Sequence, residues 1–164
     1  MVDEKLLRIF MQDHLAGATA GLELAGRARG ANRGTTYGDA LAQLADEIAE
    51  DRQALEEMLS DLGFGADRAK NLGAWAGEKL GRLKLNGQLK GYSPLSRLVE
   101  LEALMGGITL KLSLWDILLE VSEEEPRLDP GRLRRLIARG EEQRETVADL
   151  RARAARQAFL GFRT

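Results

Sequence analysis

The chain has 164 residues, which is enough for one domain with a substantial core. Its 44% hydrophobic and 30% charged residues are typical of a globular protein and exclude a disordered chain. The net charge of −2 gives no reason to expect nucleic acid or an anionic membrane as the main partner, and the lack of cysteine excludes disulfides, thiolate metal sites and thiol nucleophiles.

The first ten residues carry acids where a signal peptide needs a basic region. No apolar run approaches the length of a membrane span. We therefore expect a cytoplasmic protein without a membrane segment, in which residues 1–164 form a single helical domain.

Apolar residues at three- and four-residue steps predict a first helix over residues 3–29 and a second helix that ends at Gly63. The stretch 30–34 is rich in Gly and Asn, which suit a left-handed helix end. Thr35 or Thr36 is expected to cap the second helix, with Asp39 in its first turn.

A weaker helical pattern covers residues 67–89. Gly73, Gly77 and Gly81 lie four residues apart, so they share one face of a helix and allow another backbone to come close. Each glycine also costs about 1 kcal/mol of helix stability relative to alanine. The pattern predicts a glycine-notched helical segment that packs tightly.

Two pairs of a capping residue and a proline, Ser93-Pro94 and Asp129-Pro130, predict the starts of helices over residues 94–124 and 130–159. The helix over 94–124 is apolar on two sides, so both sides must be covered. One side holds Leu98, Leu101, Met105, Ile108, Leu112, Trp115 and Leu119, and the other holds Val99, Ala103, Leu110, Leu114, Ile117 and Val121.

These elements predict an all-α fold: an antiparallel up-down four-helix bundle with the glycine-notched segment between the second and third long helices. The inner side of the helix over 94–124 faces the bundle. Its outer side faces either the glycine-notched segment or a second subunit, and the latter alternative makes the protein a homodimer.

A few polar residues interrupt the apolar stripes. His14 lies at the centre of the first stripe, Asp51 lies within the second with Glu47 one turn earlier, and Arg144 and Arg151 interrupt the last. In an antiparallel bundle His14 and Asp51 lie at nearly one level, because each helical residue rises about 1.5 Å. Arg144 arrives at about the same level, and Thr109 is the corresponding polar residue on the helix over 94–124.

The sequence predicts a polar layer in mid-bundle, with three interpretations. The first is a structural network in which Asp51 pairs with Arg144, since an unpaired buried charge costs several kcal/mol. The second is an iron or manganese site formed by His14, Glu47 and Asp51, although a nearby guanidinium opposes a dication. The third is a small-ligand pocket, for which Gly17, Ala18 and Gly21 leave room.

The order of two helices, a long connection and two more helices resembles the ferritin-like superfamily, including its rubrerythrin- and bacterioferritin-type bundles. The resemblance covers about the whole chain and rests on helix order and lengths. That family carries a Glu and then Glu-x-x-His, repeated on the second helix pair. Here the only histidine, His14, stands where the family has a Glu, and the later helices offer Glu47-Ile48-Ala49-Glu50 and Glu142-Gln143-Arg144-Glu145.

The resemblance therefore implies a ferritin-like bundle whose metal layer has been replaced. We expect a non-catalytic structural or protein-interaction module, with no cofactor, as the function. The alternative is a metal-binding protein or oxidoreductase with an iron or manganese ion at His14, Glu47 and Asp51. Nucleic acid is an unlikely partner, because acids interleave with the arginines of the last helix at helical spacing.

Overall fold

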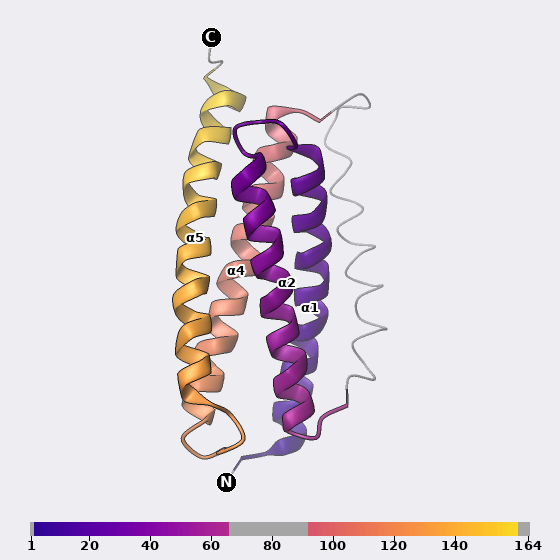
Figure 1. Ribbon diagram of the computed structural model, residues 1–164, viewed down its shortest axis with the longest axis vertical. Coiled ribbons are helices and arrows are strands. Elements are labelled where there is room, and N and C mark those ends of the chain that lie inside the picture. The colour runs from indigo at the N-terminus through magenta and orange to yellow at the C-terminus, as the bar shows by residue number, and fades with distance from the viewer. Residues whose placement is uncertain (1, 66–91, 161–164) are drawn as a thin grey trace.

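The computed structural model describes residues 2–65 and 92–160, which form four helices and, within these ranges, no strand (Figure 1). The helices are α1 (Glu4–Ala31), α2 (Gly38–Asp61), α4 (Pro94–Val121) and α5 (Pro130–Phe159). The all-α prediction is confirmed. The predicted glycine-notched segment over 67–89 lies outside the described residues. None of the described helices has the length and hydropathy needed to cross a bilayer.

The helices pack side by side with their axes along one direction (Figure 1). α1 and α5 run one way along the bundle, and α2 and α4 run the other way. α1 contacts α2 and α4, whereas α5 contacts α4 extensively and α2 only slightly. Each packed pair of neighbours is therefore antiparallel, and the parallel pairs lie diagonally across the bundle.

Three of the helices begin as their sequences predict. The side chains of Asp3, Ser93 and Asp129 each accept a hydrogen bond from a backbone N–H in the first turn that follows. Pro94 and Pro130 occupy the first helical positions, where a missing N–H costs nothing.

The start of α2 differs from the prediction that Thr35 or Thr36 caps it. The residue before the helix is Tyr37, whose side chain makes no capping hydrogen bond. Thr35 instead bonds back to Asn32: its N–H and its hydroxyl both donate to the Asn32 carbonyl, at 3.1 and 2.8 Å. Gly38 packs against the same carbonyl, because a Cβ at this position would lie 2.9 Å from the Asn32 oxygen.

The apolar core consists of two clusters. The Tyr37 cluster lies toward the 32–37 turn and includes Leu41, Leu101 and Leu150. The Trp115 cluster lies toward the other end and includes Leu118. Asp51, a buried acid, belongs to neither cluster and lies between them along α2.

α4 faces the bundle with a broader side than the sequence predicts. Leu104 and Leu118 are buried, as is Leu114, so the prediction that Leu114 lies on the outer side is wrong. Of the predicted inner residues, Met105 and Leu119 are only partly buried and the other five are buried. The outer side keeps Leu110 64% exposed and Ile117 40% exposed. The two apolar sides of α4 therefore differ in the described structure: one is core and the other is surface.

Glycines on α1 and α5 are expected to respond in opposite ways to alanine. A Cβ added at Gly17 or Gly21 meets no atom within 4 Å, so each Gly→Ala change should raise the free energy of unfolding by about 1 kcal/mol through helix propensity. A Cβ at Gly140 would lie 2.6 Å from Cδ2 and 3.1 Å from Cγ of the buried Leu112. Gly140→Ala should therefore lower the free energy of unfolding by about 1 kcal/mol.

Urea titration followed by circular dichroism measures all three glycine variants under one set of conditions. A loss of stability in Gly17→Ala and Gly21→Ala would contradict the open surroundings described for these two positions. A gain in Gly140→Ala would mean that α4 and α5 pack less closely at Leu112.

Candidate functional site

A layer of paired charges crosses the bundle between the two apolar clusters. At its centre is Asp51 on α2, whose side chain is 2% exposed. Lys111 of α4 donates to Oδ2 of Asp51, as does Gln143 of α5 at 3.1 Å. Arg139 of α5 donates to Oδ1 through both Nε, at 2.9 Å, and a terminal nitrogen. We call Asp51, Lys111, Arg139 and Gln143 the Asp51 layer.

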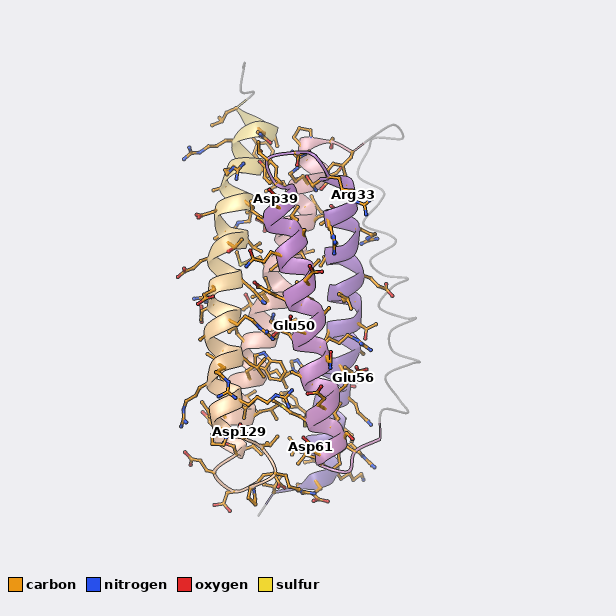
Figure 2. The ribbon with its side chains drawn as sticks, in the orientation of Figure 1. Arg33, Asp39, Glu50, Glu56, Asp61 and Asp129 are labelled. Carbon is orange, nitrogen blue, oxygen red and sulfur yellow. The ribbon has the colours of Figure 1, made fainter. Side chains whose placement is uncertain are left out.

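The members of this layer also bind one another and the rim of the bundle. Lys111 donates to Oε1 of Gln143. Arg139 donates to Glu50 at 2.7 Å, and Glu50 lies about midway along the bundle (Figure 2). The two cationic and two anionic side chains balance, which is the pairing that buried charges require.

Burial and pairing act in opposite directions on Lys111. Removal of the ammonium group from water lowers the pKa of Lys111, and the charge and hydrogen bond of Asp51 raise it, with burial the larger effect. Lys111 therefore depends on Asp51 to remain charged inside the bundle.

Two predicted members of the polar layer lie elsewhere. Arg144 is 49% exposed and pairs with Glu141 on its own helix, so the predicted Asp51–Arg144 pair is wrong. Thr109 is exposed, and its hydroxyl donates to the Met105 carbonyl at 2.9 Å, so it is not a buried member either. Arg151, the second arginine of the last stripe, pairs with Glu102 of α4 at 3.1 Å near the surface.

The wrong prediction that Arg144 faces the core has a geometric cause on α5. Apolar spacing in the sequence predicts a stripe on this helix formed by Leu133, Leu136, Ile137, Gly140, Val147, Ala148, Ala154 and Ala155. This stripe omits Leu150, which is buried with Gly140 and Val147. Including Leu150 rotates the centre of the stripe, so that Gln143 faces the core and Arg144 faces solvent. Arg139 reaches Asp51 from the edge of the stripe, which its long side chain permits.

His14 is half-buried and packs against Phe10, with 4.6 Å between the ring centroids. Burial lowers the pKa of His14, with a smaller opposing effect from Asp13. At neutral pH His14 is therefore uncharged, and it can accept a hydrogen bond through one ring nitrogen and donate one through the other.

His14 and Asp51 line the same cavity, although no hydrogen bond joins them in the described structure. The cavity lies between α1, α2 and α4 and has a volume of about 270 Å³. Gly17, Ala18 and Gly21 form part of its α1 wall. Its other walls are mainly apolar, with Leu55 from α2 and Trp115 from α4.

The predicted metal ligands do not form a coordination shell. Both carboxylate oxygens of Asp51 accept hydrogen bonds from cationic side chains. Glu47 accepts from Gln43 on the surface of α2, at 2.8 Å. Among the described residues no three His, Asp or Glu side chains converge in a way that could hold a metal ion. The charges of Lys111 and Arg139 would also repel a dication at this position.

A second polar cluster, which the sequence interpretation missed, lies at the end of the bundle near the 32–37 turn. Asn32 is fully buried there and donates to the Ala28 carbonyl at 2.8 Å and to the Tyr92 hydroxyl at 2.9 Å. Its Oδ1 accepts from Arg97 Nε at 2.6 Å. The Arg97 guanidinium lies 4.4 Å from the ring centre of Tyr37, a cation–π contact.

No protein-family model, curated protein or solved structure matches the chain.

Proposed function

We propose that the protein is a non-catalytic helical module that acts through protein–protein contact, and that it forms a homodimer through α4. One observation carries the proposal: an uncharged surface strip runs the length of this helix. We call it the α4 strip, and it consists of Leu95, Val99, Ala103, Gly106, Leu110, Ser113, Ile117 and Val121.

The α4 strip has the character of the centre of an interface. Leu95, Leu110 and Ile117 are large apolar side chains that remain exposed. Charged residues are depleted from interface cores and common at the rims. Glu102, which pairs with Arg151, lies beside the strip toward α5, and Lys111 is drawn inward to Asp51.

A second copy of the chain fits this strip because its shape is self-complementary. Gly106 is exposed, and a Cβ there would meet nothing within 4 Å. In a two-fold antiparallel pair of α4 helices centred at residue 108, Leu110 faces Gly106 of the partner subunit. Ile117 then faces Val99 of the partner subunit. Each contact occurs twice, as the symmetry of a dimer requires.

The area of the strip also suits a dimer. α4 has 28 residues, and a helix of that length is roughly 42 Å long and about 10 Å wide. Two such faces bury on the order of 850 Å², close to the ~1,000 Å² at which specific interfaces begin. Adjoining sides of α1 and α5 would supply the remainder.

The same proposal includes the ferritin-like order of the helices. Two antiparallel pairs, α1 with α2 and α4 with α5, support it, as does the shared direction of α2 and α4 (Figure 1). In this interpretation the Asp51 layer occupies the mid-bundle level at which the family places its metal ligands. A self-paired layer in that place favours a structural role over catalysis.

Multi-angle light scattering on the purified protein tests the dimer. We expect a mass twice the 18.0 kDa of one chain. Ile117→Lys places a charge within the contact, opposite Val99 of the partner subunit, and should raise the dimer dissociation constant at least tenfold, about 1.4 kcal/mol. Gln53→Lys adds the same charge on exposed α2, diagonally opposite α4, and should leave the mass unchanged.

A wild-type protein that remains monomeric at high concentration would overturn the homodimer. Equal dissociation constants for Ile117→Lys and Gln53→Lys would show that the subunits associate through another surface.

A further inference from the structure

Trp115, which lines the cavity between α1, α2 and α4, carries a hydrogen-bond donor without an acceptor. Trp115 lines the cavity and is 1% exposed. Within the described part of the chain, its indole Nε1–H is buried and has no hydrogen-bond partner. An unsatisfied buried donor costs about 1–3 kcal/mol, so the unpaired N–H of a residue that lines a cavity requires a reason.

Lys111 carries a second donor. Its ammonium group has three N–H bonds, and the described contacts use two of them, to Asp51 and Gln143. Lys111 also lines the cavity. Lys111 and Trp115 lie one helical turn apart on α4, so the two donors belong to the same wall of the cavity.

The charges that face the cavity cancel. α1 contributes Asp13 and the neutral His14, α2 contributes Asp51 and Arg52, and α4 contributes Lys111. Arg52 is further paired with Glu56 at 2.7 Å. With no net charge to balance, an ionised ligand would lose hydration without gaining a counter-ion.

The volume limits the size of the occupant. A cavity of 150 Å³ holds benzene, which has six non-hydrogen atoms. In proportion, the 270 Å³ here suits a molecule of roughly ten non-hydrogen atoms. The largely apolar walls require most of that molecule to be apolar as well.

We propose that this cavity is a binding site for a neutral, mainly apolar molecule of roughly ten non-hydrogen atoms that presents a carbonyl-type oxygen to the Trp115 indole. The apolar body lies between the small residues of α1 and the leucines of α4. The oxygen accepts from Trp115 Nε1, with Lys111 as the adjacent donor. The site shares Ala103 and Leu110 with the α4 strip, but its other walls come from α1, α2 and the inner side of α4, and the inference does not require the homodimer.

Three probes of equal size separate the effect of the carbonyl oxygen on affinity from the effects of apolar contact and of charge. Acetophenone carries a neutral carbonyl, isopropylbenzene replaces it with carbon, and benzoate replaces it with a charged carboxylate. Calorimetric titration of the full chain should give acetophenone a dissociation constant about five- to tenfold lower than that of isopropylbenzene, the usual value of one hydrogen bond. Benzoate should bind more weakly than acetophenone.

The indole N–H signals of the protein provide an independent readout. The chain has two tryptophans, so Trp75→Phe assigns the remaining NMR signal to Trp115. Acetophenone should move this signal downfield, as a new hydrogen bond does, and isopropylbenzene should not. The measurement reports on Nε1 directly and does not depend on a variant of Trp115.

Two variants complete the test. Trp115→Phe removes the donor, so acetophenone and isopropylbenzene should bind this variant equally. Gly21→Leu fills the cavity from a position where a Cβ meets no other atom, and it should abolish binding of both while the protein stays folded. Absence of binding in the wild type, equal affinity for the two neutral probes, or tightest binding of benzoate would each overturn the proposal.

Discussion

Asp51→Ala should lower the free energy of unfolding by about 3–5 kcal/mol, the cost of leaving a buried charge without its partner. The change leaves Lys111, whose side chain is only 14% exposed, without its counter-ion inside the bundle. It also removes the acceptor for Gln143 and for two donors of Arg139. Urea titration with circular dichroism as the readout measures the loss.

Arg144→Ala is the matched control for this prediction. Arg144 lies on the same level of α5 as Gln143, but it is half-exposed and pairs within its own helix. Its removal should cost no more than about 0.5 kcal/mol. Equal losses in Asp51→Ala and Arg144→Ala would contradict the Asp51 layer.

A double variant distinguishes a lost ion pair from a general defect. In Asp51→Leu with Lys111→Met, both members of the buried pair become apolar, while Arg139 can still bond Glu50 at the rim. Replacement of a whole buried pair is often neutral, so the double variant should be more stable than Asp51→Ala. Additive losses would indicate that the two side chains do not interact.

Asn32→Ala is expected to have the second largest effect, a loss of about 3 kcal/mol. The change leaves Arg97 Nε without its buried acceptor and removes the donor to the Ala28 carbonyl at the end of α1. Hydrogen bonds to charged groups contribute about 1.5–3 kcal/mol, and a neutral one contributes about 1 kcal/mol. The same variant should also loosen the contact between the end of α1 and the start of α4.

Thermal and urea unfolding of Asn32→Ala and Arg33→Ala tests this prediction. Arg33 is the next residue in the chain and is exposed, so its loss should change stability by less than about 0.5 kcal/mol. If Asn32→Ala were as stable as Arg33→Ala, the Asn32 cluster would not join the two helices in solution.

Periodicity and capping signals were sufficient for the four helices of the described chain. Apolar spacing identified each helix, and Ser93-Pro94 and Asp129-Pro130 located the starts of α4 and α5. The exception, the cap of α2, depends on how the 32–37 turn bonds to Asn32, which periodicity does not indicate.

Less of the candidate site than of the fold could be predicted from the sequence. Asp51 stands in an apolar stripe and can be found there, but its partners reach it from the edges of α4 and α5 through long side chains. One signal was present: Lys111 is the only charged residue between Glu102 and Asp116. A single charged residue in an otherwise uncharged stretch of a packed helix needs a partner of opposite charge. The position of Lys111 therefore indicates that it pairs with a buried acid.

The Asn32 cluster had no comparable signal. Asn32 reads as a residue of a helix-ending turn, and its contacts with Tyr92 and Arg97 join positions 60 and 65 residues apart in the chain. Spacing along one helix cannot reveal such contacts, since they depend on which helix ends meet at one end of the bundle.

Leu110 lines the cavity and also stands in the middle of the α4 strip. A ligand in the cavity and a second subunit on the strip would therefore share a side chain, and the two equilibria would be linked. Linkage is reciprocal: whatever factor the ligand applies to subunit association, association applies to ligand affinity. Variants of Leu110 would change both equilibria. Variants of Ile117 would change subunit association alone, and variants of Gly21 would change ligand binding alone.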